Sequence, residues 1–433
     1  MIISVSGVRG ILNVDMTLAD VARFADNFGR VANATEVLLA RDTRKTGPVI
    51  SRAVVGALVG RGISVVDFGV ISTPALFRES LTRGRPAVMV TASHNEPEYN
   101  GLKFIVDGKG IDRSSFDQVA GPARWELSPL RQGSVRRSMT TSYADDLVKR
   151  FGEGSCDGVK VALDLGGGAA ITHAVPLLRR LGCLVTSMND APGVFSRRVD
   201  PTADELALLR RMVKTKECDV GLAFDCDGDR LVIVDDAGNK RTGDYMLTLA
   251  LAQILAESKE KSVVVSVDTT QAVDIVAGEV GAKVLRSKVG EANVVSKMFE
   301  NGARLGGEGS SGGLIDGSFN YCRDSLLAAL TIIRALKRKG RKAYGEVKSF
   351  QQHRVAVALP QSKALRAIKV LAERSKGADT TDGVKIWLSK RSWVLIRASG
   401  TEDVVRVSAE AETASKASDA TRAYSAKLKE LCR

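Results

Sequence analysis

Three carboxylates alternate with other residues in the segment 225–230 (DCDGDR), directly after the apolar run 221–224. In extended backbone alternate residues share a face, so Asp225, Asp227 and Asp229 can converge on one point. Three carboxylates this close repel one another unless a cation lies among them. Because hard oxygen ligands suit Mg²⁺, the segment predicts a magnesium site. As a loop, it is expected to lie at the surface.

Two other interpretations of this segment can be weighed from its residues. A calcium EF-hand loop also begins D-x-D-x-D, but it needs glycine at its sixth position, where this chain has Arg230, and glutamate at its twelfth, where it has Asp236. A phosphatase of the haloacid-dehalogenase type would use Asp225 as its nucleophile. The EF-hand is therefore excluded, and the phosphatase stays open at this point.

A second reactive candidate is Ser93, in the segment 91–95 (TASHN) that follows the apolar run 87–90. Loops beyond the carboxyl ends of strands are where α/β domains place reactive groups. A serine there can also be an ordinary turn residue. The neighbouring His94 is a candidate base, although adjacent side chains in extended backbone point in opposite directions. The residue types alone leave both roles open.

Two glycine-rich segments offer groups that bind sugars and phosphates. Residues 306–313 (GGEGSSGG) contain one carboxylate and two hydroxyls, which can hydrogen-bond sugar hydroxyls. Residues 397–401 (RASGT) contain a guanidinium, two hydroxyls and flexible backbone amides, which suit a phosphate dianion. Either segment alone could be a plain turn.

The elements that must position these segments repeat along the chain. An apolar run, a polar loop, a helical stretch, a glycine and a second apolar run follow one another from residues 37, 159 and 263. This order predicts a right-handed βαβ unit. Copies about 100 to 120 residues apart are too widely spaced for a solenoid and indicate three similar α/β domains.

The C-terminal part has a different pattern. Apolar runs at 384–388, 393–396 and 404–409 follow one another without crossover helices, and a final helix reaches about residue 431. The fold class is therefore predicted as α/β, with three similar α/β domains with mixed sheets plus a C-terminal α+β domain with an antiparallel sheet. The predicted domains are 1–141, 142–240, 241–345 and 346–433.

Composition limits the partners. The 63 Lys and Arg exceed the 50 Asp and Glu, giving a net charge of +13, but the dense basic run 336–342 lacks the aromatic residues that stack on bases. We expect the charge to attract a small anion such as a sugar phosphate, and we predict no nucleic-acid partner. No stretch reaches the ~18 apolar residues of a membrane span, and the start lacks an export leader. We therefore predict a cytoplasmic protein without a membrane partner, and a homodimer is left open.

Taken in order, four motifs resemble the α-D-phosphohexomutase superfamily over essentially the whole chain. They are TASHN with NGLKF after it, DCDGDR, GEGSS and RASGTE, one in each quarter. The resemblance implies that Ser93 carries a phosphoryl group and that Asp225, Asp227, Asp229 and the phosphoserine hold Mg²⁺. It also implies that Arg230 lies beside that phosphate.

The same resemblance implies roles for the other site residues. Lys103 is the expected general acid/base, with Arg9 nearby. We expect like-charge repulsion from Arg9 and Arg230 to lower the pKa of Lys103, because an ordinary lysine is a poor base at neutral pH. The expected sugar contacts are Lys288, Glu308 and Ser310, and the expected ligands of the distal phosphate are Arg397, Ser399, Gly400 and Thr401.

The sugar loop departs from the common G-E-x-S-G-H form, because Gly312 stands where that form has histidine. The string GGEGSSGGLI, followed by Arg323 and Asp324, is most similar to archaeal-type phosphoglucosamine mutases. That similarity implies interconversion of glucosamine 6-phosphate and glucosamine 1-phosphate through a 1,6-bisphosphate. Phosphomannomutase/phosphoglucomutase relatives, which act on hexose monophosphates, have closely similar loops and are the alternative.

Overall fold

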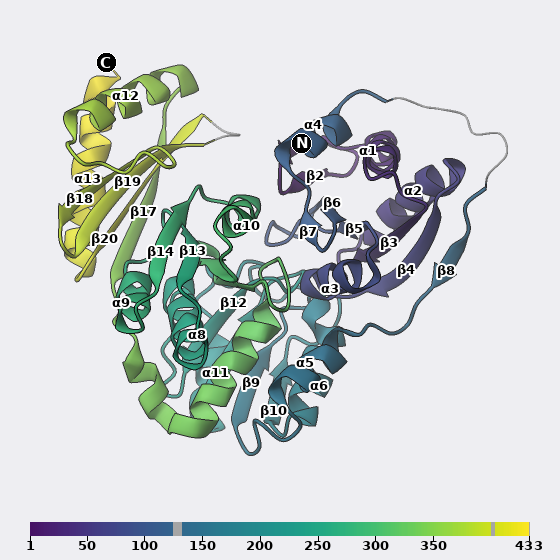
Figure 1. Cartoon of the computed structure of the whole chain (residues 1–433), viewed down its shortest axis with the longest axis horizontal. Helices are drawn as coiled ribbons and strands as arrows, with labels where there is room; N and C mark the ends of the chain where they lie inside the picture. Colours follow the sequence, from purple (N-terminus) through teal and green to yellow (C-terminus); the bar gives the residue numbers. More distant parts are fainter. Residues whose placement is uncertain (124–131, 400–402, 433) are drawn as a thin grey trace.

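The computed structural model describes residues 1–123, 132–399 and 403–432. It contains four sheets that follow one another along the chain, and we call each sheet with its helices a unit. Figure 1 shows the first unit at the upper right and the fourth at the upper left, with the second and third below them. The domain boundaries after residues 141, 240 and 345 stay predictions.

The first unit contains an eight-stranded sheet. Its elements are β1 (Ile2–Ser4), β2 (Gly7–Ile11), α1 (Leu18–Val31), β3 (Glu36–Arg41), α2 (Gly47–Gly60), β4 (Ser64–Val70), α3 (Thr73–Arg83), β5 (Ala87–Val90), β6 (Tyr99–Val106), β7 (Lys109–Gly110), α4 (Arg113–Ala120) and β8 (Val135–Arg137). The four residues of β5 are all buried. Strands covered on both faces need such continuous apolar runs.

The second and third units each contain a four-stranded sheet. The second has α5 (Tyr143–Phe151), β9 (Lys160–Asp164), η1 (Ala169–Thr172), α6 (Ala174–Arg180), β10 (Leu184–Met188), α7 (Ala207–Thr215), β11 (Val220–Phe224) and β12 (Leu231–Asp235). The third has α8 (Gly243–Glu257), β13 (Ser262–Ser266), α9 (Ala272–Glu279), β14 (Lys283–Ser287), α10 (Glu291–Glu300), β15 (Leu305–Glu308), η2 (Gly309–Ser311), β16 (Gly313–Asp316), α11 (Ser325–Lys339) and η3 (Gly340–Glu346).

One strand order recurs in these three sheets. It reads β4-β3-β5-β6, β10-β9-β11-β12 and β14-β13-β15-β16. In each, the first three strands are parallel and the last pairs antiparallel with its neighbour. The repeated βαβ unit predicted from the sequence therefore forms part of a mixed four-strand arrangement that occurs in all three sheets.

The fourth unit is antiparallel throughout, in the order β17-β20-β19-β18. Its elements are β17 (Gln351–Ala358), α12 (Gln361–Arg374), β18 (Val384–Ser389), β19 (Ser392–Ala398), β20 (Val404–Ala411) and α13 (Ala414–Leu431). The predicted fold class is confirmed.

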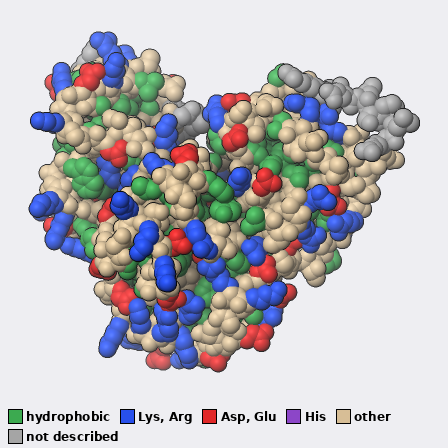
Figure 2. All heavy atoms as spheres, viewed as in Figure 1, with side chains coloured by type: hydrophobic (Ala, Val, Ile, Leu, Met, Phe, Trp, Pro, Cys, Tyr) green, Lys and Arg blue, Asp and Glu red, His purple; other side chains and the backbone are tan. Residues whose placement is uncertain are grey.

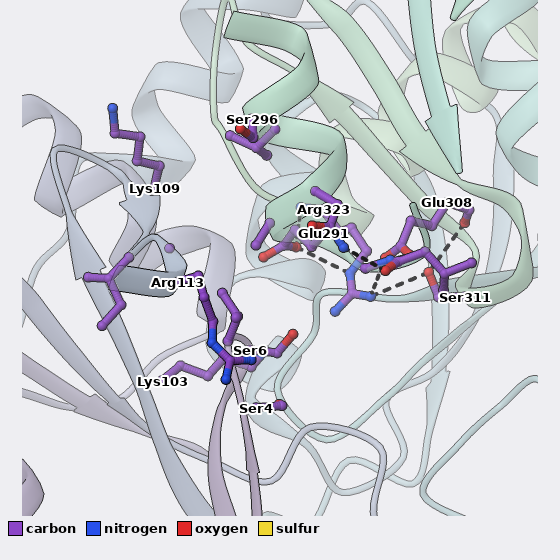
Figure 3. A pocket seen from close by; sticks show the side chains of 18 of the residues that line it. Ser4, Ser6, Lys103, Lys109, Arg113, Glu291, Ser296, Glu308, Ser311 and Arg323 are labelled. Atoms are coloured by element: carbon purple, nitrogen blue, oxygen red, sulfur yellow. Dashed lines mark hydrogen bonds and ion pairs between the residues drawn. The ribbon is translucent and has the colours of Figure 1, made fainter. Parts of the chain in front are cut away.

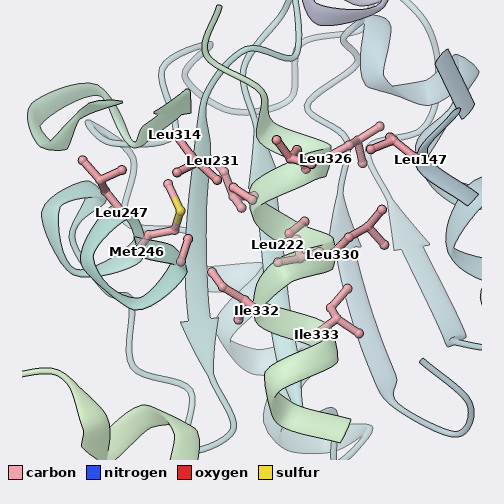
Figure 4. Close-up of a cluster of buried hydrophobic side chains, with 14 of the residues drawn as sticks. Leu147, Leu222, Leu231, Met246, Leu247, Leu314, Leu326, Leu330, Ile332 and Ile333 are labelled. Atoms are coloured by element: carbon pink, nitrogen blue, oxygen red, sulfur yellow. The ribbon is translucent and has the colours of Figure 1, made fainter. Parts of the chain in front are cut away.

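A single hydrophobic cluster runs through the first three units, whereas the fourth has its own. Helix α11 lies at the centre of the shared cluster, and Figure 4 shows its Leu326 and Leu330 among side chains of the second and third units. Asp324 starts this helix by accepting a hydrogen bond from the Leu327 N–H at 3.0 Å. In the part of the chain that the structure describes, no helix is long and apolar enough to cross a membrane.

Candidate active site

Three of the four motifs occupy the same place in the repeated sheet, the connection from its third strand to its fourth. The serine motif lies between β5 and β6, the aspartate motif between β11 and β12, and the sugar loop between β15 and β16. Carboxyl ends of parallel strands meet at one edge of a sheet, which is where α/β domains bind ligands. The repeat therefore presents each motif in an equivalent way.

A cavity of about 1250 Å³ is lined by residues of all four units. Figure 3 shows its side formed by the first and third units. Figure 2 shows the molecular surface hollowed between the first and fourth units, with Lys and Arg spread among Asp and Glu over this face. The sequence-predicted site residues that line the cavity are Arg9, His94, Lys103, Arg230, Glu308, Ser310 and Arg397.

The three aspartates converge as expected, but a turn brings them together rather than the alternation of an extended strand. Asp225, Asp227 and Asp229 lie in a turn rather than in extended backbone, with Gly228 at a φ of 69°. Their carboxylate oxygens lie within 4.8 Å of one another. All three side chains are buried, so the expectation of a surface loop is wrong. Packing of the other two α/β units over the turn covers it: the Thr73 hydroxyl donates to Asp227 at 2.6 Å.

The aspartate cluster fits a hard divalent cation. Burial, followed by repulsion from Asp227 and Asp229, raises the pKa of Asp225 well above its ordinary value. Asp227 Oδ1 and Asp229 Oδ1 are buried and have no hydrogen-bond partner among the described residues. Buried carboxylate oxygens without donors are costly unless a cation compensates them. Asp225, Asp227 and Asp229 therefore form a candidate metal site whose donors match Mg²⁺.

Ser93 lies against this cluster. Its hydroxyl is 3.2 Å from Asp225 Oδ2, and the side chain is buried. Its backbone has a φ of 51°, in the left-handed region that residues other than glycine rarely adopt. The Ser93 N–H donates to Thr91 Oγ1 at 2.8 Å, which helps to hold this conformation. Such backbone persists only where surrounding contacts fix it, and it is frequent at functional sites.

Arg44 supplies most of those contacts, and the sequence analysis missed it. It is fully buried, and its guanidinium donates to the carbonyls of Ser93 at 2.7 Å and Asn95 at 2.6 Å. It also donates to the carbonyls of Glu96 and Tyr99 at 2.5 and 2.9 Å. These four acceptors are main-chain oxygens about 50 residues away, which no side-chain pattern marks, and a fifth is the buried carboxylate of Asp42, which accepts from Arg44 Nε at 3.0 Å. The only signal was a charged residue just beyond a strand.

Lys103 reaches the aspartates across the interface of the first two units. Its ammonium donates to Asp227 Oδ2 at 2.7 Å and to Asp229 Oδ2 at 2.9 Å. Burial alone would lower the pKa of Lys103, but the two carboxylates raise it above its ordinary value. The expectation that Arg9 and Arg230 lower this pKa is therefore wrong, because the two aspartates are direct partners of the ammonium.

The other basic groups of the site are ordered by local contacts. Arg9 donates to Asn95 Oδ1 at 2.8 Å. Arg230 donates to Asp200 at 3.2 Å, and its Nε lies 4.0 Å from carboxylate oxygens of Asp225 and Asp229. Burial, followed by the charge of Arg230, lowers the pKa of His94 to about 2. His94 therefore faces the cavity as a neutral imidazole.

The sugar loop is tied to the metal loop by Arg323. The Arg323 guanidinium donates to Glu308 Oε2 at 3.1 Å and to Asp229 Oδ2 at 2.8 Å. A Cβ on Gly313 would lie 2.2 Å from the Arg323 side chain, and one on Gly312 would lie 2.3 Å from the Leu231 carbonyl oxygen. This backbone thus has no room for a side chain at Gly312.

The remaining predicted residues differ in placement. Lys288 is exposed and is not among the residues lining the cavity, although the adjacent Val289 and Gly290 are. Arg397 faces the cavity with its Nε 3.6 Å from Asp382. Ser399 is buried beside it in sequence, and its N–H donates to the Val404 carbonyl at 2.9 Å. Gly400 and Thr401 lie outside the described residues.

The sequence matches models of the phosphoglucomutase/phosphomannomutase family in four consecutive segments. They are alpha/beta/alpha domain I over residues 1–121, domain II over 141–238, domain III over 242–353 and the C-terminal domain over 355–423. A Methanopyrus kandleri protein described as a probable phosphoglucosamine mutase is 32% identical over 434 residues, which cover 95% of this chain and 94% of that protein.

Solved structures show the same fold. A phosphoglucomutase/phosphomannomutase family protein of Burkholderia thailandensis superimposes with a TM-score of 0.86 at 25% identity, covering 99% of this chain and 98% of that one. The N-acetylphosphoglucosamine mutase of Aspergillus fumigatus, solved with GlcNAc-6P and magnesium, has a TM-score of 0.62 at 16% identity, covering 99% and 96%. At that identity the second likeness concerns the fold alone.

Proposed function

Because this chain belongs to the phosphoglucomutase/phosphomannomutase family and is a phosphohexomutase, we propose that it interconverts glucosamine 6-phosphate and glucosamine 1-phosphate. The reaction runs through a phosphoryl group on Ser93 and a 1,6-bisphosphate intermediate. Phosphomannomutase/phosphoglucomutase activity by the same mechanism is the alternative.

The observation that carries this proposal is the contact between Ser93 and the aspartate cluster. The hydroxyl lies 3.2 Å from Asp225, while Lys103 lies at the other two aspartates. A phosphoryl group on this oxygen would sit between a candidate cation site and basic side chains. Charge spread over the transferring oxygens is what phosphoryl transfer must stabilise.

In the first half-reaction, the bond between phosphorus and Ser93 Oγ breaks while a bond forms to the free hydroxyl of the hexose monophosphate. Lys103 takes the hydroxyl proton and delivers it to the departing Ser93 Oγ, and Arg9 and Arg230 stabilise the phosphoryl oxygens. The bisphosphate then reverses its orientation, and the second half-reaction returns its other phosphoryl group to Ser93 Oγ, whose proton Lys103 passes to the sugar oxygen that is released. No net phosphate is gained or lost.

Mg²⁺ is the cation we assign to Asp225, Asp227, Asp229 and the phosphoserine. When bound, it would withdraw charge from the phosphoryl oxygens and neutralise the carboxylates that raise the pKa of Lys103. The magnesium in the fungal structure and the unpartnered oxygens of this cluster support the assignment.

The far end of the substrate is assigned to the fourth unit. Arg397 lines the cavity, as do Arg354 and Arg406 from the same sheet. A guanidinium fork on a phosphate dianion is a strong, directional contact. Because the bisphosphate reverses, this binding site must accept the 1-phosphate in one half-reaction and the 6-phosphate in the other. The predicted ligands Ser399, Gly400 and Thr401 complete the proposed set.

The choice of glucosamine is supported by the charges of the cavity. Glu291 and Glu308 of the third unit line it, as do the arginines of the fourth unit. Glucosamine phosphate carries an ammonium, which the glutamates can bind, and a phosphate, which the arginines can bind. Mannose and glucose phosphates carry only the phosphate. The description of the Methanopyrus relative agrees with this choice.

Substrate comparison tests the proposal. The purified protein, supplied with Mg²⁺ and a trace of hexose bisphosphate, should convert glucosamine 6-phosphate with a higher kcat/KM than mannose 6-phosphate or glucose 6-phosphate. A preference for mannose or glucose phosphate would instead assign the alternative. Release of inorganic phosphate without isomerisation would favour the phosphatase interpretation, in which Asp225 is the nucleophile and Ser93 is idle.

A further inference from the structure

Glu291 lines the cavity, although no sequence motif marked it. It is the first residue of helix α10, directly after Gly290. A carboxylate is stabilised at this end of a helix by the backbone N–H groups and the helix dipole. Glu291 therefore presents its carboxylate at the N-terminal end of α10.

Arg323 fixes the position of this carboxylate. The Arg323 backbone N–H donates to Glu291 Oε2 at 2.9 Å, and the guanidinium Nε lies 3.2 Å from the same oxygen. Figure 3 shows Glu291 on one side of Arg323 and Glu308 with Ser311 on the other. One arginine thus holds two carboxylates of the third unit in place, while the third one at the cavity, Asp268, accepts a hydrogen bond from the Ser266 hydroxyl at 2.7 Å.

Glu308 and Glu291 differ in the number of further hydrogen bonds that their carboxylates can accept. Glu308 is 3% exposed, and both oxygens are engaged: the Gly290 N–H donates to Oε1 at 2.7 Å and Arg323 donates to Oε2 at 3.1 Å. Glu291 uses only Oε2, and among the described residues no donor is bonded to its Oε1. Glu291 therefore has a free carboxylate oxygen at the cavity.

The candidate sugars differ most in charge at carbon 2. Glucosamine has an amine there that is largely protonated at neutral pH, whereas glucose and mannose have a hydroxyl. An ammonium hydrogen bond to a carboxylate is about twice as strong as one between neutral groups. A carboxylate with a free oxygen therefore discriminates between these sugars.

We propose that Glu291 recognises the 2-ammonium group of glucosamine phosphate and thereby determines the sugar specificity of this mutase. The inference rests on the proposed function, since it requires an amino sugar as substrate. In this arrangement Arg323 is a positioning residue for Glu291. The phosphate is assigned to the arginines of the fourth unit, which line the same cavity.

The test compares substrates on one variant that removes the charge and little else. Glu291→Gln should lower kcat/KM for glucosamine 6-phosphate by about ten- to hundredfold, the range expected for a lost charged hydrogen bond. Turnover of glucose 6-phosphate should stay within about twofold. Glu300→Gln, at the exposed far end of the same helix, is the matched control and should change neither value.

Two further measurements separate recognition from a structural role. Glu291→Asp keeps the charge and should keep the preference for the amino sugar. In the wild type, that preference should fall as pH rises and the substrate amine loses its proton, and in Glu291→Gln this pH dependence should be absent. N-acetylglucosamine 6-phosphate, which lacks the ammonium, should bind equally to wild type and variant.

The outcomes distinguish the two proposals. If the wild type ignores glucosamine 6-phosphate but converts glucose or mannose phosphate, the proposed substrate and the role of Glu291 both fail. If the wild type prefers glucosamine 6-phosphate and Glu291→Gln keeps that preference, or loses activity equally on every sugar, only the role of Glu291 is overturned. Turnover of glucose 6-phosphate by the variant shows that it is folded.

Discussion

The reacting end of the cavity and its phosphate-binding end are built differently. At the reacting end, Lys103 of the first unit and Arg323 of the third both bond to Asp229 of the second, and one hydrophobic cluster runs through all three units. The fourth unit has its own core and joins the third through a small hydrophobic cluster of Val267, Trp393 and Leu395 and through hydrogen bonds such as the 2.7 Å bond from Lys385 to the Val267 carbonyl.

This difference suggests a division of labour. The groups proposed to move the phosphoryl group are fixed relative to one another by packing, which is what catalysis needs. The groups proposed to hold the distal phosphate belong to a unit that has its own core and shares only a small hydrophobic cluster with the third unit. We therefore expect substitutions at the reacting end to change kcat, and substitutions in the fourth unit to change substrate affinity.

The largest effect is expected at Ser93. Ser93→Ala removes the oxygen that accepts and returns the phosphoryl group, so mutase activity should fall to background and the protein should carry no phosphate there. Activity assays and intact-mass spectrometry check both points. Ser415→Ala, at an exposed position of α13, should behave as the wild type. Activity within severalfold of wild type in Ser93→Ala would contradict the mechanism.

The next largest effect is expected at the metal site. Asp227→Asn removes one of three buried charges, so Mg²⁺ affinity should fall and kcat should drop by orders of magnitude. Calorimetric titration with Mg²⁺ and the rise in Tm on adding Mg²⁺ measure the loss directly. Asp190→Asn, at an exposed position of the same unit, is the control. Full activity after treatment with a chelator would exclude a metal role.

The fourth unit is expected to show a binding effect only. Arg397→Ala should weaken glucosamine 1-phosphate and glucosamine 6-phosphate by similar factors, about 1.5 to 3 kcal/mol each for a lost charged hydrogen bond. Phosphorylation of Ser93 and Mg²⁺ affinity should not change, which would sharpen the contrast between the two ends. Arg391→Ala, exposed in the turn between β18 and β19, is the control. Selective loss of one substrate would contradict reversal of the bisphosphate.

The smallest effect concerns the attachment of the fourth unit. Burial lowers the pKa of Lys385 to about 7 from an ordinary value of 10.5. Between these values the unfolded chain binds a proton that the folded protein does not, so the contribution of Lys385 to the free energy of unfolding rises with pH, and it is constant below pH 7.

Comparison of the wild type with Lys385→Met at pH 6.5 and 9 tests this dependence. The rings of Trp387 and Trp393 lie 5.3 and 4.1 Å from the Lys385 ammonium, so tryptophan fluorescence during urea unfolding reports on this unit. Relative to Lys385→Met, the wild type should gain stability at the higher pH. Lys390→Met, at an exposed position, should leave the pH dependence intact. If the wild type instead loses stability relative to Lys385→Met at pH 9, the predicted direction of the pH dependence is wrong.

The sequence predicted the parts of the site that are local. Apolar periodicity indicated the repeated units, and the spacing of Asp225, Asp227 and Asp229 predicted their convergence. It did not predict their burial, because that depends on two other units packing over the turn. The raised pKa of Lys103 depends in the same way on carboxylates 124 and 126 residues away.

Arg44 and Glu291 show two further features of the site that the sequence could not predict. Arg44 holds the serine loop through backbone carbonyls, which every residue has, and its one side-chain acceptor, Asp42, is its near neighbour in the sequence, so the residue types do not link it to that loop. Glu291 resembles any acidic residue in the first turn of a helix, where such residues are common. Only the three-dimensional arrangement distinguishes its free oxygen at the cavity from a solvated one.

The central claim, that Ser93 carries the phosphoryl group that moves, can be tested most directly by transfer from labelled protein. The enzyme is loaded with radiolabelled phosphate from a hexose bisphosphate, freed of ligand and mixed with unlabelled glucosamine 6-phosphate and Mg²⁺. We predict that the label maps to the peptide containing Ser93 and passes to the sugar within one turnover. Label that stays on the protein during turnover, or that maps to Asp225, would contradict the account.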